Sequence, residues 1–454
     1  MDVDPAPAIR PSACPGLVRV VATHDGGLCR VRLPGGLLTA DGARALAAAA
    51  QAHGSGALDA TNRANLQIRG VRDGHEAALA AALIDAGLGP TPDGATDLAA
   101  TALRDDVRNV MLSPAAGRDP GALADTRALG AALLAMLQAE PRFAALSPKC
   151  SLSLDGGEAL AELAHPHDLW FSARRNAAGA PDYAFGLAGR PPVETHDAPA
   201  LGAVAADQVV PLAHALLLAF LDHAPPEAKR MRDALPRLSA DALLAHAGAR
   251  LRFAVQRDAA LAGWRRQPAD PSRRFGIRSE SDPATRQVGA QVPLGRLDAA
   301  TLAALATLAE RDGDGTLRFT PWQGVLLPGV RADAAERVLA ALATLGLLTA
   351  PGSPLAHLVA CAGSTGCARA LADTKADAHA LAARLAAPQA LHLSGCARAC
   401  AQPWPAPATL VAVAAGRYDL YRRDGEHGFG RLDARHLTID QAAALLDAAR
   451  RHQD

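Results

Sequence analysis

The chain has 454 residues, and 46 Lys and Arg balance 46 Asp and Glu, so its formal net charge is zero. This length can bury several hydrophobic cores, and the neutral balance offers no basic surface for nucleic acid and no acidic tail. The N-terminus is acidic without an apolar stretch, and the longest apolar run, residues 209–221, is interrupted by Pro211 and His214. We therefore expect a cytoplasmic protein with no signal peptide and no membrane span.

The first ninety or so positions predict short strands around one helix. Residues 1–16 are rich in proline and predict an irregular segment. Strands are expected at 17–21, 29–33 and 57–60, and a helix is expected from the N-cap Thr39 to near Gly54.

The next segment, Thr61–Gly70, alternates polar and apolar residues. As a strand it would place Leu66 and Ile68 in the core and a polar set on the other face, namely Arg63, Asn65, Gln67 and Arg69. By itself this pattern fits a solvated sheet face as well as a binding surface.

An internal repeat makes the binding surface the better interpretation. Residues 34–87 match residues 293–346 without a gap. Such a match indicates a duplicated unit and two pseudo-symmetric halves that pack together. The polar Thr61–Gly70 corresponds to the more apolar Thr320–Gly329, which predicts one asymmetric site between two similar lobes. Identical residues recur at Pro34, Gly36, Leu38, Leu46, Gly54, Gly56, Leu58, Thr61, Gly70, Val71, Leu83 and Gly87, matching Pro293, Gly295, Leu297, Leu305, Gly313, Gly315, Leu317, Thr320, Gly329, Val330, Leu342 and Gly346.

Each repeat is followed by a segment that predicts mixed helices and strands. After the first repeat, Asp119 and Pro120 are expected to open a helix, and Pro148–Asp155 predicts a strand. After the second, residues 358–363 take the place of residues 112–117. A helix at 372–386, strands at 390–394 and 409–414, a hairpin at 418–431 and a helix opened by Thr438 and Gln441 should follow.

Four of the seven cysteines lie between Cys361 and Cys400. Five residues separate Cys361 from Cys367, and three separate Cys396 from Cys400. Two short loops rich in small residues could each supply a pair of thiolates to a four-iron four-sulfur cluster. Structural zinc is the alternative, although these gaps fit poorly to its usual close pairs, and a cytoplasmic chain disfavours disulfides.

Four motifs, in this order, resemble the nitrite and sulfite reductase superfamily: Thr61–Gly70, Asp106–Val110, Pro148–Lys149, and the four cysteines with Ser394–Ala397. The resemblance covers nearly the whole chain and is greatest to the precorrin-3B synthases of the aerobic cobalamin pathway. It implies an α+β fold of two pseudo-symmetric halves, each a ferredoxin-like half-domain followed by an α+β reductase-type domain. The implied ranges are 1–90, 91–264, 265–348 and 349–454, the last carrying the cluster.

The resemblance also implies roles for individual residues. Arg63, Arg108 and Lys149 correspond to residues that contact the carboxylate arms of a tetrapyrrole or an anionic substrate, and Asn65, Gln67 and Arg69 are further candidates. Cys361, Cys367, Cys396 and Cys400 correspond to the cluster ligands, with Cys400 as the bridge to the haem in the reductases.

Two departures from the reductase pattern favour the synthase branch. Sulfite-reducing members carry a second basic residue two positions after the lysine, where this chain has Ser151. The segment Ala397–Ala399 also differs from the insert common in reductases. In the synthase the tetrapyrrole is the substrate instead of a prosthetic group.

The resemblance therefore implies an oxidoreductase of the monooxygenase type. It would hydroxylate precorrin-3A at C20 with dioxygen and form a γ-lactone from the ring A acetate. Its cofactors would be the 4Fe-4S cluster and a mononuclear non-haem iron. A separate NADH-linked donor would supply electrons, because the sequence has no Gly-rich nicotinamide fingerprint.

The ligands of that iron stay open at this point. His165, His167 and Asp168 form one candidate set, and His392 is another candidate. Two alternative functions also remain: a sirohaem-dependent sulfite or nitrite reductase, and a non-catalytic tetrapyrrole carrier. Neither nucleic acid nor a membrane is an expected partner.

Overall fold

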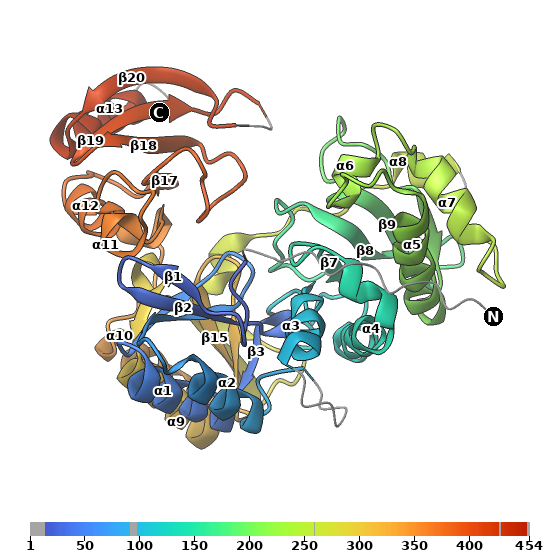
Figure 1. Cartoon of the computed structure of the whole chain (residues 1–454), viewed down its shortest axis with the longest axis horizontal. Helices are drawn as coiled ribbons and strands as arrows, with labels where there is room; N and C mark the ends of the chain where they lie inside the picture. Colours follow the sequence, from blue (N-terminus) through green and yellow to red (C-terminus); the bar gives the residue numbers. More distant parts are fainter. Residues whose placement is uncertain (1–13, 91–97, 258, 426–427, 452–454) are drawn as a thin grey trace.

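The computed structural model describes residues 14–90, 98–257, 259–425 and 428–451 (Figure 1). The predicted irregular N-terminal segment therefore lies outside the described residues, except for Cys14–Gly16. Two repeats with the same order of elements, each followed by an α+β unit, make up the described chain. The predicted α+β fold of two pseudo-symmetric halves is confirmed.

The first repeat is a small antiparallel sheet covered by two helices. Thr39 caps the first helix as predicted, since its hydroxyl oxygen accepts a hydrogen bond from the Gly42 N–H at 3.1 Å. The elements are β1 Val21–Thr23, β2 Gly26–Val31, β3 Leu37–Thr39, α1 Ala40–His53, β4 Ala57–Ala60, β5 Leu66–Val71 and α2 Glu76–Asp85.

The second repeat copies this order. Asp298 caps its first helix by accepting a hydrogen bond from the Thr301 N–H at 2.7 Å. The elements are β11 Gly276–Ser279, β12 Thr285–Gln291, β13 Arg296–Asp298, α9 Ala299–Asp312, β14 Thr316–Phe319, β15 Gly324–Arg331 and α10 Ala335–Thr344.

The two repeats exchange an edge strand. β13 of the second repeat pairs with β4 of the first, and β3 of the first pairs with β14 of the second. The resulting sheets have the orders β1-β2-β5-β4-β13 and β11-β12-β15-β14-β3. Each repeat thus completes the other's sheet, which covers two edges that would otherwise be open to pairing.

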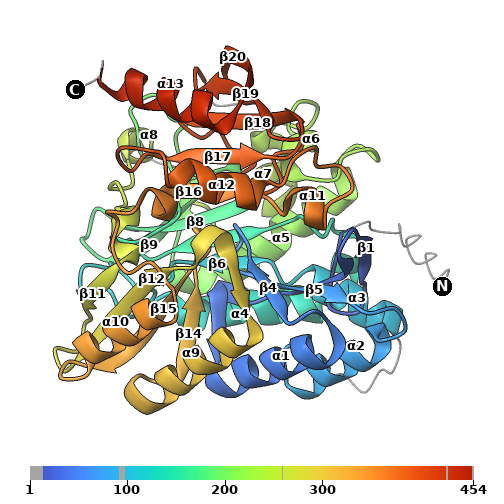
Figure 2. The same cartoon turned by 90° about the vertical axis from the view of Figure 1, so that its left-hand side faces the viewer.

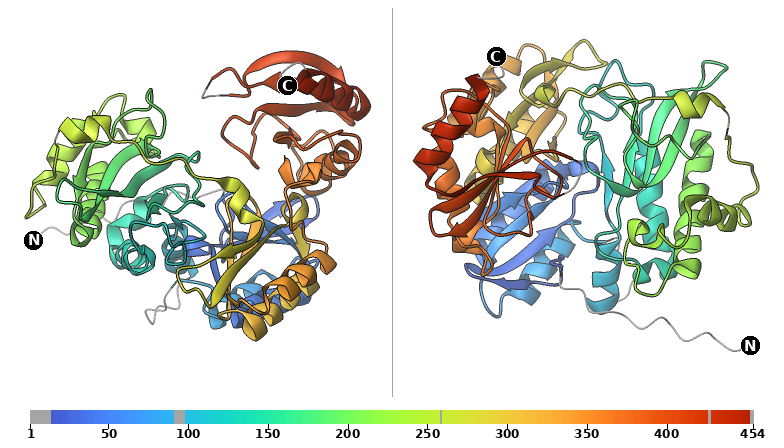
Figure 3. Two further views of the ribbon diagram at one scale, coloured as in Figure 1. Left: turned by 180° about the vertical axis from the view of Figure 1, so that it is seen from behind. Right: turned by 90° about the horizontal axis from the view of Figure 1, so that it is seen from above.

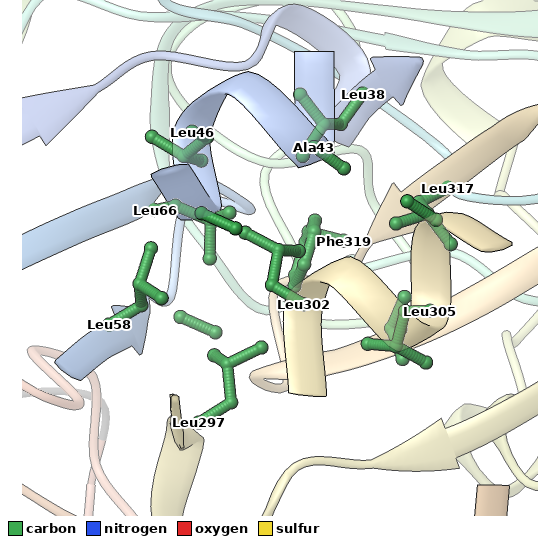
Figure 4. Close-up of a cluster of buried hydrophobic side chains, with 14 of the residues drawn as sticks. Leu38, Ala43, Leu46, Leu58, Leu66, Leu297, Leu302, Leu305, Leu317 and Phe319 are labelled. Atoms are coloured by element: carbon green, nitrogen blue, oxygen red, sulfur yellow. The ribbon is translucent and has the colours of Figure 1, made fainter. Parts of the chain in front are cut away.

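One hydrophobic core runs through both repeats. Leu38, Leu46, Leu58 and Leu66 from the first face Leu302 and Phe319 from the second (Figure 4), and all of them are buried. Helices α1 and α9 pack against one another. They lie with α2 and α10 on the outer side of the repeats, away from the α+β units (Figure 2).

Each α+β unit has a mixed five-stranded sheet and a core of its own. The first contains α3 Leu98–Asp106, β6 Val110–Leu112, α4 Arg127–Ala139, β7 Leu152–Asp155, β8 His167–Arg175, β9 Pro181–Gly189, β10 Gly202–Val204, α5 Val209–His223, α6 Met231–Ala234, α7 Ala240–Gly248 and α8 Ala259–Gly263. The second contains β16 Leu358–Ala360, α11 Gly363–Gly366, α12 Thr374–Ala382, β17 Leu391–Ser394, β18 Ala408–Ala414, β19 Arg417–Arg422, β20 Arg431–Leu437 and α13 Ile439–Arg451. The two units stand on either side of the repeats (Figure 3).

Three local predictions are wrong. The strand expected at 17–21 is displaced, since β1 covers Val21–Thr23. Asp119 and Pro120 do not open a helix, because the Asp119 carboxylate accepts hydrogen bonds from Gly121 and Ala159 in a turn, and α4 begins at Arg127. The alternating segment from Thr61 is not a strand throughout. Residues 62–64 form a turn with Ala64 at φ 56°, and the strand begins at Leu66.

No helix within the described ranges combines the length and the apolar character that crossing a bilayer requires.

Candidate active site between the two halves

The four cysteines lie on two loops at one edge of the second α+β sheet. Strands β16 and β17 are parallel neighbours, so their carboxyl ends meet at the same edge. Cys361 and Cys367 are in the loop after β16, and Cys396 and Cys400 are in the loop after β17. None of the four forms a disulfide.

The surroundings of the sulfur atoms suit an iron–sulfur cluster. The Gly395 N–H donates a hydrogen bond to Cys361 Sγ at 3.2 Å, and Thr374 Oγ1 lies 3.4 Å from the same sulfur. Burial, and then the charges of Cys396 and Cys361, raise the pKa of the Cys400 thiol. The donor set therefore fits a cluster bound by four thiolates.

The first repeat holds both cysteine loops in place. The Arg69 guanidinium donates to the Gly366 carbonyl at 2.6 Å and forms a bidentate pair with Asp25, at 2.9 and 2.6 Å. His24 Nδ1 lies 3.0 Å from the Ser364 carbonyl, close to where β1 meets α11 in Figure 1. The Asn62 amide donates to the Ala401 carbonyl at 3.0 Å. Arg69 and Asn62 therefore position the cysteine loops.

The cations chosen from the sequence lie in different surroundings. One Arg63 nitrogen is 3.4 Å from the Lys149 carbonyl, and burial together with Arg230 lowers the pKa of Arg63 to about 10. Arg108 is buried and donates to the Leu88 carbonyl at 2.9 Å. Lys149 is exposed.

The polar candidates around them are also engaged within the fold. Asn65 is buried, and its side-chain oxygen Oδ1 accepts a hydrogen bond from the Leu33 N–H at 2.8 Å. Gln67 lies beside the Arg30 guanidinium. The structure thus brings Arg63, Asn65 and Arg108 to one gap of about 10 Å³, which holds about one water molecule. It does not bring Lys149, Gln67 or Arg69 to that gap.

His167 lines the same gap and is paired with a second buried histidine, His165. His165 Nδ1 is 3.2 Å from His167 Nε2, and His167 Nδ1 is 3.2 Å from Ser151 Oγ. Burial and the nearby Arg63 lower the pKa of His165 to about 3, and burial and His165 lower the pKa of His167 well below its usual value. Both imidazoles are therefore neutral at pH 7.

The structure supplies no ready ligand set for a mononuclear iron. Asp168 forms a salt bridge with Arg230 and accepts hydrogen bonds from the Met231 and Ser151 N–H groups, each at 2.9 Å. His392 lies on the buried strand β17, and burial lowers its pKa to about 4. Within the described parts of the chain, no three His, Cys, Asp or Glu side chains are close enough together to hold one metal ion.

A cavity of about 640 Å³ lies beside this gap, between the halves. Asn62 lines it from the first repeat, and Trp404 lines it from the second α+β unit. The Trp404 ring meets the His165 ring edge-on, with the two ring centroids 5.0 Å apart. The volume is within the range of cofactor and substrate pockets, whereas the gap is far too small.

Family models match most of the two repeats and one α+β unit. The model described as "Nitrite/Sulfite reductase ferredoxin-like half domain" matches residues 22–86 and 279–345. The model described as "Nitrite and sulphite reductase 4Fe-4S domain" matches residues 104–254. The four cysteines lie outside both matches.

Individual relatives extend the likeness over the chain. A precorrin-3B synthase of Sinorhizobium sp is 30% identical over 91% of this chain and 83% of its own length. The chain belongs to the nitrite and sulfite reductase superfamily. Ferredoxin–nitrite reductases of Zea mays and Oryza sativa subsp. japonica are 31% and 29% identical over 83% of this chain, which spans 67% and 64% of their lengths.

A solved structure shows the same fold. The Mycobacterium tuberculosis NirA protein matches with a TM-score of 0.74 over 94% of this chain and 80% of its own, at 20% sequence identity. At this level of sequence identity the match is evidence for the fold alone.

Sequence reasoning missed several residues that the structure brings to the site. Arg230 pairs with Asp168 behind the histidines, and Arg274 lines the cavity. Nothing in their sequence surroundings distinguishes them. Trp404 did carry a signal, because it is one of only four tryptophans and follows Cys400 closely.

Proposed function

We propose that the protein is a precorrin-3B synthase, an oxidoreductase that hydroxylates precorrin-3A at C20. One atom of dioxygen would enter at C20 and the other would leave as water, with two electrons from an NADH-linked donor. The ring A acetate would then close a γ-lactone. We place the enzyme in the cytoplasm, where the free thiols stay reduced.

The observation that carries this proposal is the hydrogen bond between Ser151 and His167 beside Arg63. Reduction of sulfite or nitrite places a small anion among several cations, and this position offers a hydroxyl group and a neutral imidazole instead. The chain spans 83% of the length of the precorrin-3B synthase but 67% of the length of the Zea mays nitrite reductase. This difference supports the synthase branch.

Four cysteines would hold a 4Fe-4S cluster: Cys361, Cys367, Cys396 and Cys400. A bound cluster would supply single electrons to the reaction. The chain's own part is to orient the ring. Arg63 lines the small gap as a buried cation, and the neutral His167, which lines the same gap, could accept or return a proton there.

The deciding experiment incubates the anaerobically purified protein with precorrin-3A, an NADH-linked reductase and ¹⁸O₂. Mass spectrometry should find one ¹⁸O atom in the product, together with the lactone. In parallel, reduced methyl viologen should drive no turnover of nitrite or sulfite. Rapid nitrite or sulfite turnover with no labelled product would contradict the proposal.

A sirohaem-dependent nitrite reductase is the second candidate, since the plant nitrite reductases are as similar in sequence as the synthase. The absorption spectrum of the purified protein separates the two. Sharp sirohaem bands would favour the reductase, whereas broad cluster absorbance with iron in excess of acid-labile sulfide would favour the synthase.

A further inference from the structure

One of the four cysteine sulfur atoms differs from the other three in its surroundings. Cys361 Sγ accepts a hydrogen bond from the Gly395 N–H at 3.2 Å and has Thr374 Oγ1 at 3.4 Å. In the part of the chain that the structure describes, the sulfur atoms of the other three cysteines accept no hydrogen bond. The polar contacts of the site are therefore concentrated on one sulfur atom.

Thr374 is the first residue of α12, and its side chain lies against Cys361. It is fully buried, and its hydroxyl group also donates a hydrogen bond to the Cys361 carbonyl at 2.9 Å. Gly363 leaves room for this contact, because a Cβ atom there would lie 2.8 Å from the Thr374 nitrogen. A thiolate accepts hydrogen bonds and donates none, so with a thiolate at Cys361 the one hydroxyl proton lies between two acceptors of the same residue.

The next residue, Lys375, is a cation whose ion pair is weak. Its side chain is 15% exposed, and its ammonium group donates to the Leu294 carbonyl at 2.5 Å. Its distance to the Asp59 carboxylate is 3.8 Å, and Arg296 already holds that carboxylate in a bidentate pair at 2.7 and 3.0 Å. Burial lowers the pKa of Lys375, and the charges of Asp59 and Cys361 oppose this effect.

Two other carboxylates at the start of α12 have partners of their own. Asp373 accepts a hydrogen bond from the Ala376 N–H at 3.2 Å, and Asp377 accepts one from the Tyr418 hydroxyl at 2.6 Å. Neither forms an ion pair with Lys375 within the described ranges. A variant without the Lys375 charge would therefore leave these carboxylates in their present contacts.

We propose that Thr374 and Lys375 raise the reduction potential of the cluster that the four cysteines would hold, Thr374 by a hydrogen bond from its hydroxyl group to Cys361 Sγ and Lys375 by its positive charge. Reduction by one electron adds one negative charge to the cluster and its thiolates. Hydrogen bonds to sulfur and a nearby cation stabilise that added charge. The electron comes from the NADH-linked donor of the proposed function, and the two residues would have the same role in a reductase.

An anaerobic redox titration of the purified, cluster-loaded protein tests this role. Dithionite is the reductant, no substrate is present, and EPR of the reduced cluster gives its midpoint potential. Thr374→Val removes the hydroxyl group and keeps a β-branched side chain, and Lys375→Met removes the charge. At a fixed solution potential, the ratio of reduced to oxidised cluster should fall about threefold to tenfold in Thr374→Val and about tenfold in Lys375→Met. A tenfold fall corresponds to a potential about 59 mV more negative.

Three further variants serve as controls. Thr374→Ser keeps the hydroxyl group and Lys375→Arg keeps the charge, so both should restore the wild-type potential. Thr365→Val is the matched control, because Thr365 belongs to the same cysteine loop but donates to the Ala362 carbonyl at 3.3 Å instead of meeting a sulfur atom.

Iron and acid-labile sulfide, measured on each sample, show whether the cluster is present. An unchanged potential in either Thr374→Val or Lys375→Met would exclude that residue from the role, and an equal shift in Thr365→Val would overturn the role of Thr374. Loss of the cluster from both variants would also overturn the proposal, because the two residues would then serve cluster binding. Lowered potentials in both variants, together with no conversion of precorrin-3A by the wild type, would contradict the proposed function alone.

Discussion

Single residues in this protein carry charges and protonation states that only burial explains. His392 shows this most simply. It is 1% exposed on β17, its Nε2 has no hydrogen-bond partner, and burial lowers its pKa to about 4. In the unfolded chain an ordinary histidine binds its proton near pH 6.5.

His392 should therefore make folding sensitive to acid. Above pH 6.5 the imidazole is neutral in both the folded and the unfolded chain. As the pH falls from 6.5 to about 4, the unfolded chain binds a proton that the folded chain does not, so the free energy of unfolding decreases. The maximum loss is about 3 kcal/mol. His392→Leu should lose less stability over this range, as measured by thermal unfolding midpoints from pH 7 to pH 4. His379→Leu, at an exposed position of α12, is the control for the substitution itself.

Arg69 illustrates how a residue with a recognisable pattern can have another role. The alternating segment suggested a face for ligand binding, but Arg69 is 3% exposed and joins Asp25 to the loop of Cys361 and Cys367. The guanidinium supports the cysteine loop instead of meeting a ligand directly.

Arg69→Gln should consequently weaken retention of the cluster. Residues that orient metal ligands typically contribute tenfold to a hundredfold to metal affinity, so iron and acid-labile sulfide after anaerobic dialysis against a chelator should fall roughly tenfold faster. Arg72→Gln, at the end of the same segment and bonded to the carbonyls of Gly54 and Ala52, is the control. Equal retention in Arg69→Gln and wild type would show that the contact has no such role.

At the scale of elements, the exchanged strands β3 and β13 join the sheets of the two repeats. The short turn before β3 brings Gly36 against β14, at φ 70°. A Cβ atom at Gly36 would lie 2.1 Å from the Phe319 carbonyl oxygen, so only glycine fits this crossing.

Gly36→Ala should lower stability well beyond the cost of the backbone conformation. Gly74→Ala measures that cost alone, because Gly74 has φ 82° and open space around its Cβ position. We expect about 1 kcal/mol for Gly74→Ala and about 1–3 kcal/mol more for Gly36→Ala. Thermal unfolding of both variants gives the comparison, and equal losses would contradict a steric role for the crossing.

At the scale of the whole molecule, the repeats act as one folding unit and each α+β unit has its own core. Residues from both repeats share one core, whereas the core around Phe171 and Leu216 belongs to the first α+β unit alone. The cysteine loops and the cavity then lie where the halves meet.

Neither half should fold correctly by itself. Fragments 1–264 and 265–454 each lack one strand of a sheet and one side of the shared core, so we expect exposed apolar surface and aggregation when each is expressed alone. Co-expression should restore a soluble complex, detectable by size-exclusion chromatography. Residues 98–257 alone should fold, since their core is internal. A well-folded monomer of either half would contradict the shared core.

Features that depend on neighbours in the chain were accessible from the sequence. Thr39 and the Thr438–Gln441 capping box occur as predicted, with the Thr438 N–H donating to Gln441 Oε1 at 2.9 Å, because capping involves residues three positions apart. The repeat and its two pseudo-symmetric halves were also readable, since duplication leaves identical residues at fixed spacing. The Asp119 prediction failed because the carboxylate found a partner forty positions away, in Ala159.

The sequence by itself therefore determined the α+β class, the duplication and the group of four cysteines. Only the tertiary structure decided the strand exchange, the neutral pair of His165 and His167 beside Arg63, and the unpaired Arg274 in the cavity wall. The physical reason is that burial and charge pairing depend on segments that are distant in the sequence. No local pattern indicates which of the many arginines is buried without a carboxylate partner.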